Sequence, residues 1–192
     1  MVRVYALAGK AHHGKSTVAN AMEAMLSTRH GDSRVHRMSF AAALKNDIRQ
    51  LGFPQEFIDS KPLWMRELMQ KYGQARRAVD EFYWLNKVTS RIQEMARGLP
   101  FKETQYIIID DVRFRNEVAG LRSLQHHSPD KIDVTLFRVE RMDYSDDTPQ
   151  DVSEVELDEF QDWDAQITAR SGQVDYLCDA AREALKLFGG LT

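Results

Sequence analysis

The feature that most limits the possible folds of this chain is a glycine-rich stretch close to its amino terminus. The stretch reads Gly9-Lys10-Ala11-His12-His13-Gly14-Lys15-Ser16 and fits the pattern G-x-x-x-x-G-K-[ST]. The apolar run Val2–Ala8 precedes it, and apolar residues at helical spacing follow it, which is the strand–loop–helix setting that the pattern requires. Its glycines let the backbone turn several N–H groups toward one anion. We therefore predict a phosphate-binding loop.

Each residue type in this loop suits contact with a nucleoside triphosphate. We expect the Lys15 ammonium to reach the β- and γ-phosphate oxygens and the Ser16 hydroxyl to bind Mg²⁺. Successive residues point in different directions and no third metal ligand is evident, so His12 and His13 are expected to bind through their backbone amides and not as a metal pair. Lys10 either adds positive potential or is solvated. The predicted ATP-binding residues are Gly9, Lys10, Ala11, His12, His13, Gly14, Lys15, Ser16 and Thr17.

Short β-branched runs alternate with stretches of helical period along the whole chain. This alternation predicts right-handed crossovers and a parallel, three-layer α/β fold. Gly52 and Gly73 are placed to end helices. The expected strands are Val2–Ala8, Val35–Phe40, Tyr106–Ile109, Ile132–Val139 and Gln166–Ala169, and the expected helices include 41–51, 116–127 and 174–188.

The chain has 192 residues, of which 43% are hydrophobic, and this predicts a single globular domain. The single cysteine, Cys178, cannot form an internal disulfide, and no run of about 18 apolar residues is present. We therefore expect a cytoplasmic protein without a membrane partner. No basic stripe suggests binding to a nucleic-acid polymer.

Charge is distributed unevenly. Residues 140–164 carry eleven acidic side chains and one basic side chain, Arg141, whereas the remainder carries 25 Lys and Arg against 18 Asp and Glu. Such an imbalance fits a body that handles a small polyanion beneath a mobile acidic flap, and it fits a solvated acidic loop equally well. Trp163 is a candidate for pinning this segment to the body.

A second group of polar residues follows the most apolar predicted strand, at the carboxyl edge where open α/β sheets bind ligands. An acidic residue there, such as Asp110, can orient Mg²⁺, and Arg113 can hold a phosphate. The alternative is that Asp110 and Asp111 only cap the next helix. A GTPase would carry the base-recognition sequence N-K-x-D. The one Asn-Lys pair of this chain, Asn86-Lys87, is followed by Val-Thr, so the sequence does not favour a GTPase.

Several strings spread over most of the chain resemble the bacteriophage deoxynucleoside monophosphate kinases, within the P-loop nucleotide and phosphomevalonate kinase group. The most specific is Asp111-Val112-Arg113-Phe114-Arg115-Asn116-Glu117. The others are the loop 9–17, Ser39-Phe40-Ala41-Ala42-Ala43-Leu44-Lys45, Arg66-Glu67-Leu68-Met69-Gln70-Lys71-Tyr72-Gly73 and Ser153-Glu154-Val155-Glu156-Leu157-Asp158.

The resemblance implies a P-loop kinase fold with a parallel sheet of about five strands. It implies a core of 1–52, 101–139 and 165–192, a helical monophosphate-binding insertion over 53–100 and a lid over 140–164. It further implies Mg²⁺-ATP as donor and a deoxynucleoside monophosphate as acceptor, and because the family often dimerises it is compatible with a homodimer. The implied acceptor residues are Lys45, Arg66, Gly73, Gln74, Trp84, Asp111, Arg113 and Glu117, and the implied catalytic residues are Lys15, Arg138 and Arg141, with Ser16 and Asp110 at the metal.

Of the two lid arginines, Arg141 is the preferred one, because Arg138 falls within the predicted strand. The chain departs from the family at His13, where serine is common, and at Arg170, where an Asn-x-Gly turn is expected on the donor-adenine side. Two rivals stay open. One is a kinase of another phosphorylated acceptor, such as phosphomevalonate, and the other is a module that binds ATP without transferring phosphate.

Overall fold

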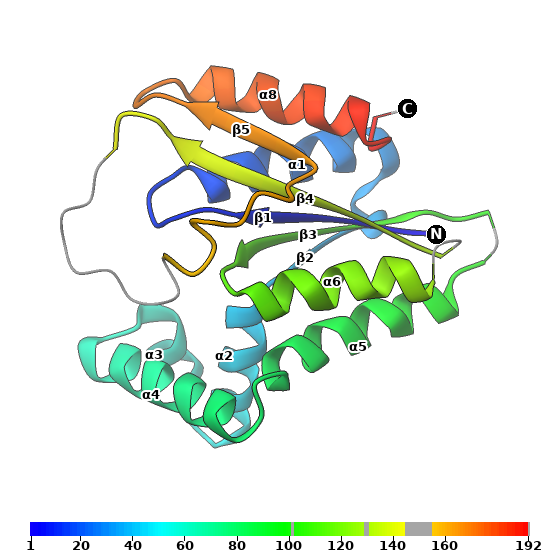
Figure 1. The fold of residues 1–192 in the computed structure, drawn as a ribbon. Coiled ribbons are helices and arrows are strands. Elements are labelled where there is room, and N and C mark those ends of the chain that lie inside the picture. The colour runs from blue at the N-terminus through cyan, green and yellow to red at the C-terminus, as the bar shows by residue number, and fades with distance from the viewer. Residues whose placement is uncertain (101, 129–130, 145–154, 192) are drawn as a thin grey trace.

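A five-stranded parallel sheet lies at the centre of the computed structural model, which describes residues 1–100, 102–128, 131–144 and 155–191. The strand order is β2-β3-β1-β4-β5 (Figure 1). Every neighbouring pair is parallel, so every connection crosses over the sheet. The strands are β1 (Val2–Ala8), β2 (Val35–Met38), β3 (Gln105–Val112), β4 (Ile132–Arg141) and β5 (Ala165–Ala169).

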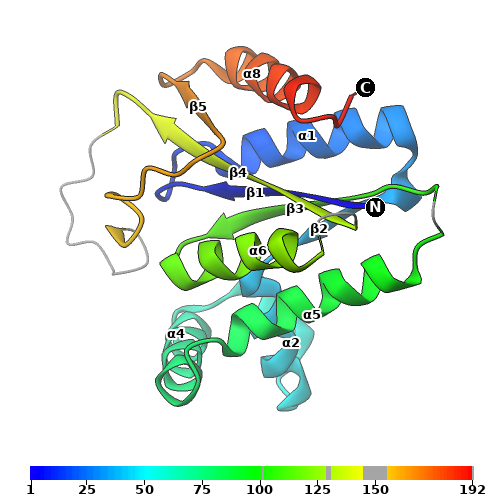
Figure 2. The ribbon, with the colours of Figure 1, turned by 45° about the vertical axis from the view of Figure 1, so that its right-hand side comes forward.

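Helices cover both faces of the sheet and confirm the predicted three layers (Figures 1 and 2). On one face α1 (Lys15–His30) packs beside α8 (Val174–Leu187). On the other face α5 (Tyr83–Gly98) and α6 (Arg115–His127) pack against the sheet and each other. Beyond them lie α2 (Phe40–Gln50), α3 (Gln55–Ser60) and α4 (Leu63–Val79).

The central strand β1 is apolar almost throughout because both of its faces are covered. Val4 and Ala6 contribute to the core beneath α5 and α6, whereas Tyr5 and Leu7 contribute to the core beneath α1 and α8. This burial on two sides explains why a continuous apolar run, rather than an alternating one, predicted the strand.

The helical region between β2 and β3 differs from the prediction in one respect. Gly73 does not end a helix: α4 continues through it to Val79. Gly73 is absent from the positive-φ residues, so it has ordinary helical geometry, and its carbonyl accepts the indole N–H of Trp84 at 3.2 Å. Only the α3 and α4 part of the predicted insertion stands apart from the sheet, because α5 packs directly on it.

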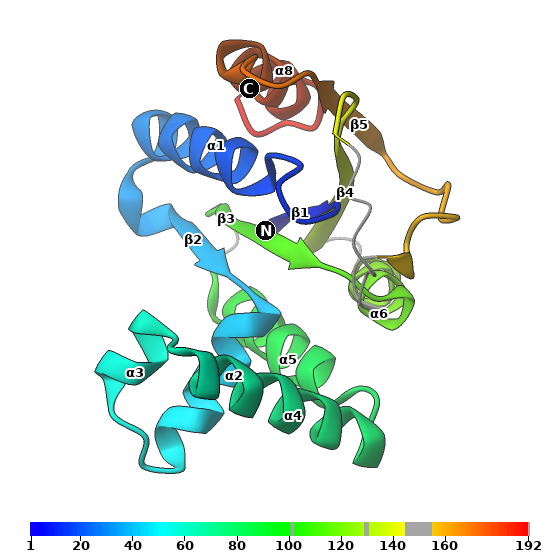
Figure 3. The same ribbon diagram turned by 90° about the vertical axis from the view of Figure 1, so that its left-hand side faces the viewer.

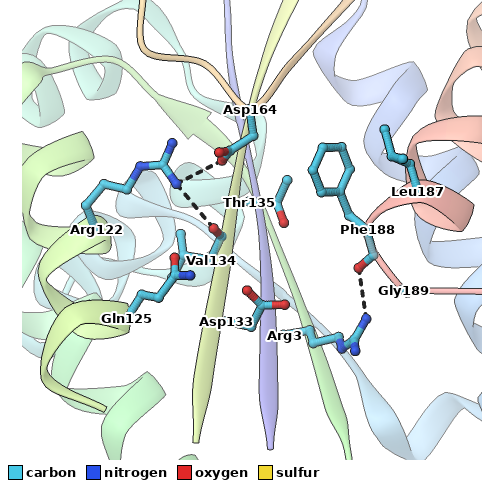
Figure 4. A pocket seen from close by; sticks show the side chains of 10 residues that line it. All are labelled: Arg3, Arg122, Gln125, Asp133, Val134, Thr135, Asp164, Leu187, Phe188 and Gly189. Carbon is cyan, nitrogen blue, oxygen red and sulfur yellow. Dashed lines mark hydrogen bonds and ion pairs between the residues drawn. The ribbon is translucent and has the colours of Figure 1, made fainter. Parts of the chain in front are cut away.

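The amino-terminal half of β4 is an open sheet edge, because β5 pairs with β4 only from Phe137 onward. A hollow of about 450 Å³ lies beside this edge, and Figure 4 shows the side chains that line it. The Asp164 carboxylate accepts the Leu136 N–H at 2.7 Å, and Arg122 pairs with Asp164 at 2.9 Å and donates to the Val134 carbonyl at 3.4 Å. These side chains take hydrogen-bonding positions of a missing strand, which protects the edge. No residue of the predicted site lines this hollow.

Candidate functional site

The parallel topology brings the carboxyl ends of the strands to one edge of the sheet, where ligands of open α/β sheets bind (Figure 3). The glycine-rich loop follows β1, and Ser39 follows β2. Asp110 and Asp111 lie near the end of β3, and Arg138 and Arg141 near the end of β4. Residues that are far apart in the sequence therefore share this edge.

The backbone of the loop has a shape that requires glycine at both ends. Gly9 has φ 151° and Gly14 has φ 91°. A Cβ on Gly9 would overlap the backbone carbonyl oxygen of Val139 on β4. His12 also has positive φ, at 62°. The loop thus packs tightly against β4, and its residues follow β1 directly into α1.

Lys15 is the first residue of α1 and is only 8% exposed. Its ammonium donates to the carbonyl oxygens of Gly9 and Lys10, at 2.6 Å each. The side chain therefore folds back over the loop, where phosphate oxygens could replace the two carbonyls. Ser16 is exposed in the first turn of α1.

A cavity of about 160 Å³ lies between this loop and the turn after β5. The turn carries Arg170, whose backbone N–H donates to Gln173, and the Ser171 N–H donates to Asp143. The loop residues that line the cavity are His12, His13, Gly14 and Thr17, and the remaining lining residues are Glu140, Arg141, Ala169–Val174 and Leu177.

The end of β4 places the two predicted catalytic arginines differently from each other. Arg141 was preferred because only Arg138 was expected to lie within the strand. In the structure both arginines belong to β4, so that reason does not hold. Arg138 is 6% exposed and pairs with Glu140 at 2.9 Å and Asp158 at 3.2 Å. Arg141 donates to the His12 carbonyl at 3.3 Å. Arg141 also pairs with Asp143 at 3.7 Å, so carboxylates contact both arginines, and Arg141 in addition contacts the loop.

The residues that follow β4 also contact the loop. The ring of Tyr144 lies 4.4 Å from the Arg141 guanidinium and 5.8 Å from the His13 ring. Burial and then the nearby charge of Lys15 lower the pKa of His13, which favours a neutral ring. Residues 145–154 of the expected lid lie outside the described residues. Trp163 packs against the core as expected, with Arg138 5.8 Å from its ring.

A second cavity, of about 130 Å³, lies on the other side of β3, between α2, α4, α5 and the start of α6. It is large enough for roughly four water molecules. Many of the predicted acceptor residues meet here. The lining residues are Phe40, Ala41, Leu44, Gly73, Arg77, Trp84, Asp111, Arg113 and Glu117.

Arg77 is the charged residue of this cavity that the sequence analysis missed. It lies four residues after Gly73 on α4, which puts both on one face of the helix. Its guanidinium stacks 4.1 Å from the centre of the Phe114 ring and lies 3.6 Å from a carboxylate oxygen of Glu117. The spacing from Gly73 is the signal that could have found it.

Two carboxyl groups, those of the buried Glu117 and the half-buried Asp111, form the polar wall of the second cavity. Glu117 is 3% exposed and accepts the backbone N–H groups of Arg113 and Phe114 at 2.8 and 3.2 Å. Burial raises its pKa to about 7. Asp111 accepts the N–H groups of Phe40 and Ala41 at 3.0 and 2.8 Å, and burial raises its pKa as well.

These contacts correct the capping alternative considered from the sequence. Asp111 does cap a helix, but the helix is α2, which precedes it in the chain, and not the next one. Glu117 instead satisfies the N–H groups at the start of α6. Asp110 caps neither helix; it pairs with Arg37 at 2.7 Å.

Three predicted acceptor residues do not line the cavity. Gln74 is exposed on α4. Arg66 precedes Gly73 by seven residues and therefore lies on the same face of α4. The Nε of Arg66 donates to the Lys61 carbonyl at 2.9 Å. Lys45 lies on α2, next to Leu44 of the cavity wall.

The two predicted metal ligands lie on different elements, Ser16 in the first turn of α1 and Asp110 near the end of β3. Ser16 shares one face of α1 with Glu23, two turns on, and Glu23 and Asp110 both pair with Arg37, at 3.0 and 2.7 Å. Hydroxyl and carboxylate oxygens are suitable ligands for Mg²⁺, which keeps several waters and binds substrate phosphates. Within the described residues, no group of three or more His, Cys, Asp or Glu forms a dedicated metal site.

Comparison with models of known protein families gives no match, and comparison with curated protein sequences gives none. The fold and the site thus define an α/β protein with a five-stranded parallel sheet and two cavities at the sheet's carboxyl edge. In the described part of the chain, no helix is both long and apolar enough to cross a membrane.

Proposed function

We propose that this chain is a P-loop kinase that transfers the γ-phosphoryl group of ATP to a deoxynucleoside 5′-monophosphate. The observation that carries the proposal is the pair of cavities on one sheet edge. One is lined by His12, His13, Gly14 and Thr17 of the glycine-rich loop, and the other by residues that include Arg77, Arg113 and Trp84. A phosphate loop facing an arginine-lined pocket suits the binding of two anionic substrates.

The loop side would bind the donor. Backbone N–H groups of the loop and the Lys15 ammonium would hold the β- and γ-phosphates, and α1 adds the positive end of its dipole. Mg²⁺, held through Ser16 and with Asp110 nearby, would neutralise developing charge on the phosphate oxygens. Lys15 would exchange its two carbonyl contacts for phosphate oxygens.

The arginine-lined side would bind the acceptor. Arg113 and Arg77 supply cations, and Trp84, which is 2% exposed, supplies an apolar wall for a base. An oxygen of the acceptor phosphate would form a bond to the γ-phosphorus while the bond to the bridging oxygen breaks, and ADP leaves with that electron pair. The acceptor phosphate is already largely ionised near pH 7, so no general base is needed. Arg141, against the loop, would stabilise the transferring group.

Incubation with Mg²⁺-ATP and each of the four deoxynucleoside monophosphates, with the ribonucleotides and phosphomevalonate alongside, tests the proposal. We expect ADP and a deoxynucleoside diphosphate in equal amounts. Consumption of phosphomevalonate with inert deoxynucleotides would replace the proposal with the rival acceptor. ATP binding without transfer to any monophosphate would identify a non-catalytic module.

Lys15→Ala should stay folded by circular dichroism and lose turnover; wild-type kcat would remove Lys15 from the mechanism.

A further inference from the structure

A stretch of sheet edge outside the candidate site is open to hydrogen bonding. β4 pairs with β1 from Ile132 onward, but β5 joins the other side of β4 only from Phe137. The hollow of about 450 Å³ lies beside the part of β4 that β5 leaves free. Its volume falls in the range of roughly 300–1,000 Å³ that ligand pockets occupy. The hollow is therefore large enough for a ligand, and the strand edge decides which kind of ligand fits.

The hydrogen bonds of β4 show which of its backbone groups face this hollow. The Lys131 carbonyl accepts the Val2 N–H of β1 at 2.6 Å, so the odd-numbered residues of β4 face β1. Leu136 faces the other way, because its N–H donates to the Asp164 carboxylate at 2.7 Å and its carbonyl accepts the Asp164 N–H at 3.0 Å. Backbone groups alternate in direction along a strand. The even-numbered residues therefore direct both their N–H and their C=O groups toward the hollow.

Among the described residues, nothing pairs with the Val134 N–H or the Ile132 carbonyl on this side of β4. The neighbouring groups are occupied: the Ile132 N–H donates to the Ser128 carbonyl at 2.8 Å, and the Val134 carbonyl accepts from Arg122 at 3.4 Å. Val134 is 3% exposed, and buried backbone groups are nearly always hydrogen-bonded. The hollow thus calls for one acceptor and one donor at this edge.

A single residue of a parallel strand would supply both groups. In a parallel pair, the residue opposite position i donates its N–H to the carbonyl of residue i−1 and accepts the N–H of residue i+1. The residue that serves Ile132 and Val134 would therefore lie opposite Asp133. An antiparallel strand would instead need both backbone groups of Val134, whose carbonyl already accepts from Arg122. The free groups fit a short extended segment that runs in the same direction as the other strands.

The two faces of this edge carry opposite charges. Figure 4 shows Arg122, from α6, on one side of β4 and Phe188, at the end of α8, on the other. Asp133 lies on the α8 side, because Val134 packs into the core beneath α5 and α6 and successive side chains alternate. Arg3 donates to the Phe188 carbonyl at 2.8 Å, and within the described ranges no lysine or arginine pairs with the Asp133 carboxylate. A basic side chain beside Asp133 and an acidic one beside Arg122 would complement these charges.

We propose that this edge binds an extended segment of a partner protein, which adds to β4 in line with β5 as a parallel strand. The residue opposite Asp133 would be basic, since its side chain shares the face of Asp133 and cross-strand pairs of opposite charge are stabilising. The next residue points toward α6 and would be acidic, near Arg122, which is 29% exposed although it pairs with Asp164. The expected motif is a basic residue followed directly by an acidic one. This inference is independent of the proposed function, because no residue of that site lines the hollow.

The first test leaves the protein unchanged and modifies the backbone of the peptide acetyl-Thr-Val-Lys-Glu-Thr-amide. Calorimetric titration should give saturable binding. N-methylation of the lysine removes the donor to the Ile132 carbonyl and should weaken binding about 10-fold or more. N-methylation of the glutamate, whose N–H points away from β4, is the matched control and should change the affinity far less. Equal effects of the two methyl groups, or no saturable binding of the parent peptide, would overturn the proposal.

The second test removes the free donor on the protein side. Val134→Pro lacks this N–H, whereas Val134→Ala keeps it and only shortens the side chain. Proline is tolerated in an edge strand where the missing N–H would face outward, so Val134→Pro should fold, as circular dichroism would verify. We expect the peptide affinity to fall about 10-fold or more in Val134→Pro and to stay within about twofold in Val134→Ala. The same affinity in both folded variants would contradict strand addition.

Exchanging a charge tests the motif, and sedimentation tests the rival occupant. Asp133→Lys should weaken binding of the Lys-Glu peptide and favour acetyl-Thr-Val-Glu-Glu-Thr-amide, whereas Asp32→Asn, at an exposed position, should match the wild type. An unchanged preference in Asp133→Lys would overturn the motif. A dimer that Val134→Pro abolishes, in a protein that binds neither peptide, would assign the edge to a second copy of this chain and overturn the proposal.

Discussion

At the residue scale, Gly9 of the loop and Gly31 at the end of α1 show two different reasons for a glycine, a positive φ and a lack of room for a Cβ. Gly9 combines a positive φ with an approach to Val139 that leaves no room for a Cβ. Gly31, at the end of α1, has φ 90° but no atom within 4 Å of its Cβ position. The two positions therefore separate backbone strain from steric overlap.

We expect Gly31→Ala to lower the free energy of unfolding by about 1–3 kcal/mol, from strain alone. Gly9→Ala should cost more, because the β4 backbone must also move. Urea unfolding followed by circular dichroism measures both. Equal losses for the two variants would show that the contact with Val139 carries no additional energy.

Arg113 provides the residue-scale test of the second cavity. We expect Arg113→Ala to raise the acceptor KM by the equivalent of roughly 1.5–3 kcal/mol, the usual value of a hydrogen bond to a charged group. The ATP KM should change far less. Arg97→Ala, an exposed arginine near the end of α5, is the control. A similar rise in both KM values would assign Arg113 to the scaffold rather than to the acceptor.

At the scale of elements, the start of α6 links a buried carboxyl group to pH. The pKa of Glu117 is raised from 4.5 to about 7 in the folded protein, because burial disfavours its charged form. The folded state therefore holds this proton more tightly than the unfolded state does. The resulting contribution of Glu117 to the free energy of unfolding is fully present below pH 4.5 and is lost as the pH rises to about 7.

Stability should accordingly fall by up to about 3 kcal/mol between pH 4.5 and 7 on account of Glu117. Glu117→Gln keeps an oxygen for the two backbone N–H groups and removes the titration, so its stability curve should be flatter in this range. Glu159→Gln, at an exposed position, should keep the wild-type slope. Urea midpoints measured at half-unit pH steps would decide, and parallel curves for wild type and Glu117→Gln would refute the linkage.

Gly73 in α4 presents a conflict between helix stability and cavity space. A Cβ there would meet only Leu44, at 3.8 Å, which is ordinary contact. We expect Gly73→Ala to raise the free energy of unfolding by about 1 kcal/mol, because alanine favours helix. The added methyl would enter the acceptor cavity and raise the acceptor KM. Gly98→Ala at the end of α5, where nothing lies within 4 Å, should leave that KM unchanged.

These elements also show what the sequence could predict. The buried strands were evident because burial on both faces leaves a continuous apolar run, as in Ile107–Ile109. The end of α4 was mispredicted because Gly73 is kept inside the helix, facing the cavity, rather than at a left-handed cap. The capping of α2 by Asp111 depends on the pairing of Met38 with Ile109 across β2 and β3, which a local pattern does not contain.

At the scale of the whole molecule, the acidic segment links the two sides of the sheet edge. Asp158 pairs with Lys10 of the loop and with Arg138 of β4, at 2.7 and 3.2 Å. Glu156 accepts the backbone N–H of Arg115, at the start of α6, at 2.9 Å. One short stretch thus contacts the elements that bear both cavities, which is the position that a segment covering two substrates would need.

A bisubstrate ligand tests whether the two cavities serve one reaction. If they face a common cleft, adenosine joined to a deoxynucleoside through a phosphate chain of suitable length should bind 10²–10⁴-fold more tightly than either nucleotide alone. A chain too short to span the cavities should lose that gain. Calorimetric titration of a series with increasing phosphate number would show an optimum length. Affinities that never exceed those of the separate nucleotides, at any length, would mean that the two cavities bind independently and that transfer between them is not their function.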